Sequence, residues 1–424
     1  MKDESTCCSD TKMLSVSVSE AERKERAAAR WKILRSALLG KNKSSIAKNA
    51  SIHRFSGFQM LSRQLVEIAT PSAVDETNEN NYAVYDYTIP HGCTTSHHKE
   101  ESITASAALR VRTRERIQNE GQKIDLKALT SHRHFGVDNT GNARVWDSEA
   151  TLTHCLMQAC WDDQKSSAIT SKLGVANMWD LASRNNNDNS LHVVELGAGM
   201  AGIAGLSLAA TALAGFSDNG IGVDVLLTDG HPDAVQNNTV NTGLTNSLYS
   251  GHEDKANIRS ARLLWKDTQE GADDCTNLIA NNQRRYFDLC LASDCVHFQE
   301  FHAALAMTVA RLLRVGGAAI FCQPHRSNSL QRFMKLLACI NKRDAPLWEF
   351  SLVDDYDEGM SKRHRQYSEE DSSYDPSIHY PALLLVRKIR ELDEGLDRET
   401  AVRHMADRDA MKTSTAAAAD RQIR

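Results

Sequence analysis

The sequence predicts an α/β fold: an open sheet of seven strands, the last of them antiparallel, with a small N-terminal α+β extension. From Leu191 onward, short apolar runs alternate with helix-like segments, which is typical of parallel strands covered by helices on both faces. The first run ends near Glu195 and turns through glycines into an apolar helical segment, which indicates a strand, a tight turn and a helix. A chain of 424 residues with 41% hydrophobic content is long enough to bury a substantial core.

The regions around this sheet differ in composition. Ser19 and Glu22 resemble a capping box that begins a helix, and the alternation from Tyr82 to Tyr87 indicates strands of a small antiparallel sheet. The charged run from Arg110 to Arg116 favours a solvated helix or an insertion over a binding patch. The predicted regions are a disordered tail (1–18), an N-terminal helix and small antiparallel sheet (19–160), an insertion (161–190), the sheet domain (191–390) and a charged tail (391–424).

Seven apolar runs make up the predicted sheet. They are Leu191–Leu196, Val223–Thr228, Ala261–Trp265, Phe287–Ala292, Ala318–Cys322, Glu349–Val353 and Ala382–Arg387. Helical stretches separate most of these runs, but the sequence indicates none between the last two. An antiparallel final strand is therefore expected, because only such a pair can be joined without a crossover.

The charge, hydrophobicity and cysteine content of the chain argue against several classes of function. The net charge of −5 gives no basic footprint for nucleic acid, and no apolar run approaches the roughly 20 residues of a membrane helix. Ten cysteines without a paired C-x-x-C pattern indicate a reducing compartment, and we expect a monomer in the cytoplasm and nucleus. Cys93, His97 and His98 lack a fourth ligand at suitable spacing, so no metal site is predicted.

The turn formed by Gly197, Ala198 and Gly199 predicts a cofactor site. Glycines let the backbone approach a ligand closely, and the following helix offers its free amides. The spacing through Gly202 also matches the dinucleotide fingerprint, which many cofactor folds share. Glu195 favours S-adenosylmethionine instead, because a carboxylate at this position would repel a pyrophosphate and attract the positive methionine end. A nicotinamide oxidoreductase and an ordinary turn without a ligand remain alternatives.

Further candidates follow the later strands, whose carboxyl ends meet at one edge of the sheet. Asp229 is placed to accept hydrogen bonds from a ribose diol, or else to cap the next helix. Trp265 is placed to pack against an adenine, or else lies in the core. Asp294 and His297 follow the fourth strand and are either catalytic residues or a helix cap and a surface histidine.

Together, residues 195–202, 226–229, 263–265 and 287–294 resemble the seven-strand, Rossmann-like, S-adenosylmethionine-dependent protein-lysine methyltransferases. Narrower motifs resemble the calmodulin-directed branch of that family. These are residues 29–35, Arg54 and Phe55, residues 138–142 with Trp146, residues 355–358 and residues 379–381. The resemblance extends from about residue 28 to residue 388.

The resemblance implies a lysine methyltransferase that trimethylates a calmodulin lysine, with S-adenosyl-L-methionine as cofactor. It places the glycine turn, Asp229, Trp265 and Ser293 at the cofactor, with Trp146 reaching over from the N-terminal part. Related enzymes often have Asp-x-x-Tyr where this chain has Asp294 and His297. The alternatives are a methyltransferase of the same fold acting on another protein, a small molecule or nucleic acid, and a non-catalytic cofactor-binding module.

The chemistry of lysine methylation gives the remaining expectations. We expect Asp294 to orient the attacking amine and to stabilise its positive charge as the methyl group arrives. Aromatic walls favour a methylated ammonium, and the candidates are Phe298, Tyr356 and Tyr380. The basic residues 362–365 are either a contact for an acidic protein such as calmodulin or a solvated loop.

Overall fold

The computed structural model describes residues 57–69, 82–90, 106–114, 145–161, 167–182, 189–217, 220–252, 254–281, 286–341, 345–370 and 374–408. Several sequence predictions lie outside these ranges: the tail at 1–18, the helix at Ser19, the motifs at 29–35, at Arg54 and Phe55 and at 138–142, and the group of Cys93, His97 and His98. Within the described part of the chain, no helix is long and apolar enough to cross a membrane.

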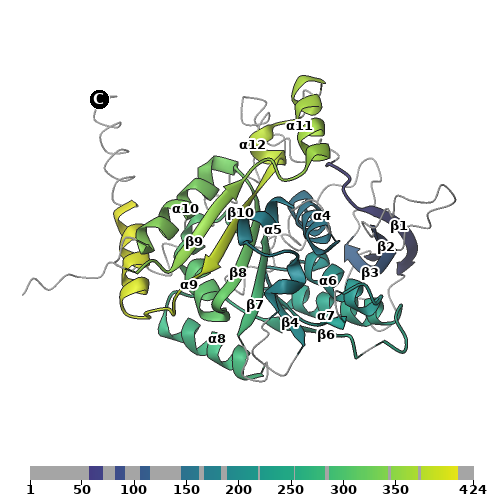
Figure 1. Cartoon of the computed structure of the whole chain (residues 1–424), viewed down its shortest axis with the longest axis horizontal. Coiled ribbons are helices and arrows are strands. Elements are labelled where there is room, and N and C mark those ends of the chain that lie inside the picture. Colours follow the sequence, from purple (N-terminus) through teal and green to yellow (C-terminus); the bar gives the residue numbers. More distant parts are fainter. Residues whose placement is uncertain are drawn as a thin grey trace, which may run out of the picture.

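A seven-stranded mixed sheet forms the middle layer of the molecule (Figure 1). Its strands are β4 (Ser190–Leu196), β5 (Gly222–Asp229), β6 (Ala256–Arg262), β7 (Phe287–Ser293), β8 (Leu313–Pro324), β9 (Trp348–Val353) and β10 (Pro381–Lys388). Their order is β6-β5-β4-β7-β8-β10-β9, and β10 is antiparallel to both of its neighbours. The predicted α/β fold with an antiparallel last strand is confirmed.

Helices cover both faces of this sheet (Figure 1). They are α4 (Asp147–Trp161), α5 (Ala168–Leu173), η4 (Met178–Leu181), α6 (Ile203–Leu213), α7 (Pro232–Asn246), α8 (Gln269–Asn281), η6 (Gln299–Phe301), α9 (His302–Leu312), η7 (Arg326–Asn328), α10 (Ser329–Ile340), α11 (Glu358–Glu370), α12 (Pro376–His379) and a helix over 396–408. Two of them, α11 and α12, lie between β9 and β10. The expectation of no helix there was wrong, because α11 is strongly polar and buries only Met360 completely.

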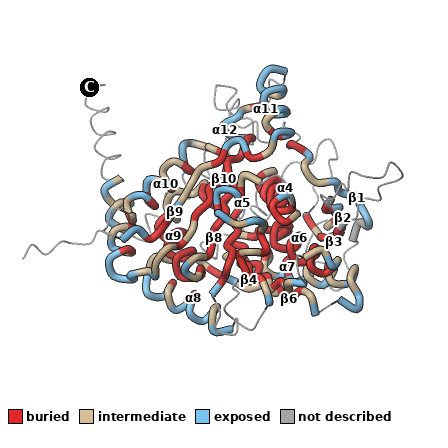
Figure 2. Tube along the Cα trace, in the orientation of Figure 1, coloured by how far each residue is buried: buried red, intermediate tan, exposed pale blue. Residues whose placement is uncertain are grey.

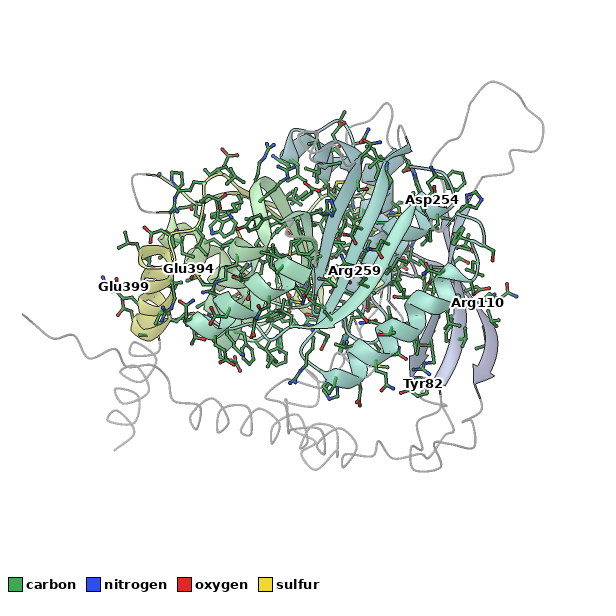
Figure 3. The ribbon with its side chains drawn as sticks, turned by 90° about the horizontal axis from the view of Figure 1, so that it is seen from below. Tyr82, Arg110, Asp254, Arg259, Glu394 and Glu399 are labelled. Carbon is green, nitrogen blue, oxygen red and sulfur yellow. The ribbon has the colours of Figure 1, made fainter. Side chains whose placement is uncertain are left out.

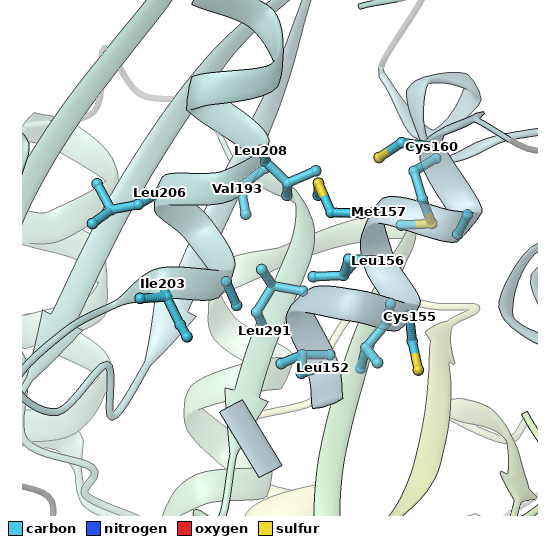
Figure 4. Packing of buried hydrophobic residues seen from close by; sticks show 14 of the residues in the cluster. Leu152, Cys155, Leu156, Met157, Cys160, Val193, Ile203, Leu206, Leu208 and Leu291 are labelled. Carbon is cyan, nitrogen blue, oxygen red and sulfur yellow. The ribbon is translucent and has the colours of Figure 1, made fainter. Parts of the chain in front are cut away.

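Each face of the sheet has its own hydrophobic core, because successive strand residues point to opposite sides. Val193 and Leu291 face α4 and α6, where Leu152 and Leu156 pack against them (Figure 4). The other face packs against α9 and α10. The buried residues are concentrated in the central strands and in the helices next to them (Figure 2).

Strand β6 begins five residues earlier than the sequence predicts. It spans Ala256–Arg262, whereas the prediction was Ala261–Trp265. As the edge strand of the sheet it carries polar residues such as Arg259, which bonds to Asp224 of β5 and is labelled in Figure 3. The larger apolar residues of the predicted run, Leu263, Leu264 and Trp265, follow the strand, and Leu263 is buried. Trp265 is therefore beyond the strand end rather than inside the strand.

The N-terminal extension forms a separate antiparallel sheet of β1 (Ser62–Ala69), β2 (Tyr82–Pro90) and β3 (Ser106–Arg114). The prediction of a solvated helix or insertion from Arg110 onward was wrong for β3. Leu109 and Val111 are fully buried, while Arg110 pairs with Asp86 at 2.7 Å on the opposite face. Alternation of small apolar and charged residues has the period of a strand. Tyr82 and Arg110 lie at the end of the molecule opposite Glu394 (Figure 3).

Two segments beside the central domain are packed onto it. Within the stretch interpreted as an insertion, η4 buries Trp179, whose Nε1 donates to the carbonyl of Cys160 at 3.2 Å. Within the stretch interpreted as a charged tail, Asp397 is fully buried and accepts two hydrogen bonds of 2.7 Å from Arg390. These contacts attach both segments to the central domain.

Candidate active site

The glycine turn after β4 lies in the left-handed backbone region, with φ of +63° at Gly197 and +58° at both Gly199 and Gly202. A Cβ atom on Gly197 would lie 2.8 Å from Sγ of Cys295 and 3.3 Å from the Trp265 ring. A Cβ on Gly202 would lie 3.0 Å from Leu227. The turn therefore needs glycine for both its conformation and its close packing. The structure brings Trp265 and the turn together, as the predicted cofactor site requires.

Asp229 at the end of β5 holds this turn. Its Oδ2 accepts a hydrogen bond of 3.0 Å from the amide of Gly199, and its Oδ1 accepts one of 2.7 Å from the amide of His231. Burial raises the pKa of Asp229, and these amide hydrogen bonds oppose the rise. The N-cap of α7 is His231 rather than Asp229. A backbone hydrogen bond from Gly230 also lowers the pKa of Asp229, so one acceptor position of the carboxylate remains for a ligand hydroxyl.

Glu195 lies inside the fold together with Glu149, a residue that the sequence analysis missed. Oε2 of Glu195 accepts from the amide of Gly205 at 2.8 Å, and Oε1 of Glu149 accepts from the amide of Ile203 at 2.9 Å. Both side chains therefore accept hydrogen bonds from backbone amides in the first turn of α6, and amides at a helix N-terminus stabilise negative charge. Burial raises the pKa of Glu195 to about 8, and the charge of Glu149 contributes to the rise. Burial likewise raises the pKa of Glu149 to about 7.

One oxygen of this acidic pair still needs a donor. Among the described residues, none donates a hydrogen bond to the buried Oε1 of Glu195. A buried acceptor without a hydrogen-bond donor costs free energy unless a ligand or a water molecule donates a hydrogen bond to it. The position of Glu149 in the first turn of an otherwise apolar helix face, which includes Leu152 and Leu156, was the available signal in the sequence.

Asp294 lies just beyond β7, and its backbone has a φ of +53°, which is uncommon for a residue with a side chain. Its amide donates to the carbonyl of Cys322 at 3.0 Å, which ties it to β8. Its Oδ1 accepts from Nε2 of Gln323 at 3.0 Å, and its Oδ2 accepts from Nη1 of Arg326 at 2.7 Å. Neither Gln323 nor Arg326 was predicted, although both lie at the carboxyl end of β8.

Trp146 approaches the same group from the start of α4. The Arg326 guanidinium lies 5.6 Å from the Trp146 ring centroid, and the Trp146 carbonyl accepts from the amide of Glu149 at 3.0 Å. The structure therefore brings together Trp146 and Asp294, which the sequence separates by almost 150 residues. Through Glu149, the same helix end also meets Ile203, the first residue of α6 after the glycine turn.

His297 and Ser293 flank Asp294 along the chain. Ser293 is the last residue of β7, and its carbonyl accepts from Sγ of Cys295 at 3.2 Å. The His297 ring meets Phe298 edge-on at 5.1 Å. The hydrogen bonds of the Asp294 carboxylate go to Gln323 and Arg326, and the structure does not join His297 to them.

The predicted aromatic residues Tyr356 and Tyr380 lie near the start of β10, beside the end of β8. Their rings stack at 6.0 Å, and their hydroxyls donate to the carbonyls of Pro381 and Asp354, each at 2.7 Å. Both side chains are buried, and Phe58 packs edge-on against Tyr380 at 5.9 Å. These contacts hold α11 and the N-terminal segment to the sheet edge.

The basic residues 362–365 lie on α11 and not in a loop. His364 stacks on Tyr380 at 4.2 Å, and Arg363 donates to the carbonyl of Phe58 at 2.6 Å. Lys362, Arg363 and Arg365 are all exposed, so this segment of α11 presents positive charge to solvent.

Comparison with known proteins assigns the family. The sequence model of the lysine methyltransferase family matches residues 126–339, which is half of the chain. The chain belongs to the lysine methyltransferase family. It is also similar to the calmodulin-lysine N-methyltransferase of Arabidopsis thaliana, with 28% identity over 368 residues that cover 85% of this chain and 96% of the relative.

Solved structures of two methyltransferases were also compared with this member of the lysine methyltransferase family. The human methyltransferase 10 domain containing protein has a TM-score of 0.29 and 11% identity, covering 52% of this chain and 79% of its own. The rRNA methylase from Streptococcus thermophilus has a TM-score of 0.27 and 12% identity, covering 48% and 89%. The strand order of the sheet, with β10 antiparallel to both neighbours, defines the fold.

The cofactor of this family and fold is S-adenosyl-L-methionine. The described residues fit it in three respects. The glycine turn leaves no room for a side chain, Asp229 keeps acceptor capacity, and Oε1 of Glu195 is a buried acceptor that needs a donor. A ligand with a positively charged methionine end and a ribose diol meets these needs.

Proposed function

We propose that this enzyme transfers methyl groups from S-adenosyl-L-methionine to a lysine of calmodulin, and that it trimethylates that lysine. The observation that carries the proposal is that Trp146, which belongs to a motif resembling calmodulin-directed enzymes, meets the same Arg326 guanidinium as Asp294, which belongs to the broader family motif. The relative from Arabidopsis thaliana supports it over nearly its whole length.

The cofactor would be held by residues from four strand ends. We assign its contacts to Glu195, Gly197, Ala198, Gly199, Asp229, Trp265, Ser293 and Trp146. Asp229 would accept hydrogen bonds from the ribose, and Oε1 of Glu195 would accept one from the methionine end. When bound, the cofactor supplies an activated methyl group on a positively charged sulfur.

Asp294 would act on the substrate amine. Free lysine has a pKa of about 10.4, yet only the neutral amine attacks. A half-buried site lowers the pKa of an ammonium, and fixed orientation supplies much of the rate. The carboxylate of Asp294 would accept a hydrogen bond from the amine and stabilise the positive charge that develops on its nitrogen. His297, three residues after Asp294 in the chain, would lie near this step.

An acidic substrate would meet the basic side of α11. Lys362 and Arg365 are exposed there, and α11 is joined through His364 and Tyr380 to the edge of the sheet that carries Asp294. Complementary charge of this kind accelerates association and orients the partner.

Transfer of labelled methyl groups to purified calmodulin tests the proposal. We expect labelling of wild-type calmodulin and no labelling of one calmodulin variant when its lysines are replaced by arginine one at a time. A mass increase of three methyl groups on that lysine would support trimethylation. Absence of transfer, with S-adenosylhomocysteine still bound, would favour another protein substrate. Absence of binding as well would favour a non-catalytic module whose cofactor site is degenerate.

A further inference from the structure

Two groups that attract cations converge beyond β8. One is the Asp294 carboxylate, and the other is the ring face of Trp146. Carboxylates form strong charge-assisted hydrogen bonds with ammonium groups, and tryptophan is the best aromatic partner for a cation. In this structure the cation between them is the guanidinium of Arg326, whose side chain is 15% exposed while that of Asp294 is 11% exposed.

The guanidinium of Arg326 makes fewer hydrogen bonds than those of three arginines elsewhere in the fold. Arg311, Arg314 and Arg390 each donate hydrogen bonds from all three guanidinium nitrogens. Arg326 donates one, to Asp294, and within the described residues its buried Nε has no hydrogen-bond partner. An unsatisfied buried donor costs free energy, so the bound position of this guanidinium is only weakly favoured.

The backbone around Arg326 is anchored independently of its side chain. Nε2 of the preceding His325 lies 3.1 Å from Oδ1 of Asp354, and its Nδ1 lies 2.6 Å from Nε2 of Gln331. Gln323, on the other side, bonds to both Asp294 and the amide of Val296. Rotation of the Arg326 side chain would therefore release the Asp294 carboxylate without unfolding the segment.

We propose that Arg326 occupies the subsite for the substrate lysine in the free enzyme, and that the incoming lysine displaces it. The proposal rests on the proposed function in that the incoming cation is a lysine ammonium. Displacement costs free energy, which a protein substrate supplies through contacts elsewhere and a small amine does not. Arg326 thus acts as a specificity-determining residue that excludes free amines from Asp294.

Binding of n-butylammonium, which mimics the end of a lysine side chain, tests this in the presence of S-adenosylhomocysteine. We expect Arg326→Gln to bind n-butylammonium at least about tenfold more tightly than the wild type, because a hydrogen bond to a charged group becomes available. Arg326→Lys retains a cation and should bind as weakly as the wild type. The gain should disappear in the double variant Arg326→Gln/Asp294→Asn. Ligand-observed NMR titration measures all four proteins.

The matched control is Arg314→Gln, because Arg314 pairs with Asp288 at the opposite end of β8. It should leave n-butylammonium binding unchanged. Unchanged or weaker binding in Arg326→Gln would overturn the proposal and make Arg326 a permanent partner that positions Asp294. If Arg326→Gln does not fold, Arg326→Met replaces it, and unfolding of both would also overturn the proposal. Calmodulin takes no part in this titration, so failure of methyl transfer bears on the proposed function alone.

Discussion

Two acidic sites lie at the same edge of the sheet, and they differ in whether a cation lies next to the buried carboxyl groups. Glu149 and Glu195 meet at the first turn of α6, and among the described residues no lysine, arginine or histidine pairs with either. Asp294, beyond β7, has the guanidinium of Arg326 at 2.7 Å. The first site therefore has no cation of its own among the described residues, whereas the second carries one. We infer that the first is prepared for the cofactor and the second for exchange of one cation for another.

The largest expected effect is at the second site. Asp294→Ala should lower kcat at least about 100-fold, because it removes the group that orients the amine and stabilises its charge. The affinity for S-adenosylhomocysteine should stay within about twofold, since the first site is untouched. Steady-state kinetics and calorimetry measure the two quantities. Unchanged turnover would remove the distinction between the two sites.

A change in the glycine turn should affect the first site instead. Gly197→Ala places a Cβ atom 2.8 Å from Sγ of Cys295 at a φ of +63°, so we expect cofactor affinity to fall at least about tenfold. The matched control is Gly215→Ala, which has a φ of +79° but no atom within 4 Å of the new Cβ. That variant carries the same backbone strain and should bind the cofactor normally. Equal losses of affinity would mean that strain alone matters.

The pH dependence of stability should come from the first site. Burial raises the pKa of Glu195 to about 8 and that of Glu149 to about 7, above the value of 4.5 for a free glutamate. The folded state therefore holds protons that the unfolded state releases. The stabilisation from these protons is complete below about pH 4.5 and is lost as the pH rises toward about 8.

Melting temperatures between pH 5 and pH 8 measure this effect. We expect the decline over that interval to be smaller in Glu195→Gln, whose side chain cannot ionise. Asp357→Asn serves as the comparison, because hydrogen bonding to His154 holds the pKa of Asp357 below its usual range and removes it from this interval. An identical slope in the wild type and Glu195→Gln would show that the acidic pair is not the source.

The smallest expected effect lies outside both sites. Reversing the charge of Lys362 and Arg365 to glutamate should raise the KM for calmodulin a few-fold at low salt and leave kcat unchanged, since exposed charges act mainly on association. The control is Lys335→Glu on α10, which is also exposed. Equal KM values for the two charge-reversal proteins would argue against contact between α11 and the substrate.

Local patterns were sufficient for the elements that have strong periodicity or a required backbone conformation. The apolar strands β4, β5 and β7 and the glycine turn at Gly197 and Gly199 were predictable, because each follows from a short run of neighbours. Strand β3 was missed because charged residues alternate with small apolar ones, so that the charge hid the period of two. Helix α11 was missed because it buries almost nothing.

The sequence by itself determined the α/β fold, the glycine turn, and the acids Asp229 and Asp294 at strand ends, since adjacent residues encode them. Only the tertiary structure decided which side chains lie next to the acids Glu195 and Asp294. Glu149 reaches Glu195 from α4, and Arg326 reaches Asp294 from beyond β8. The physical reason is that the charge state of a buried carboxylate depends on its neighbours in space, and those neighbours come from segments far apart in the chain.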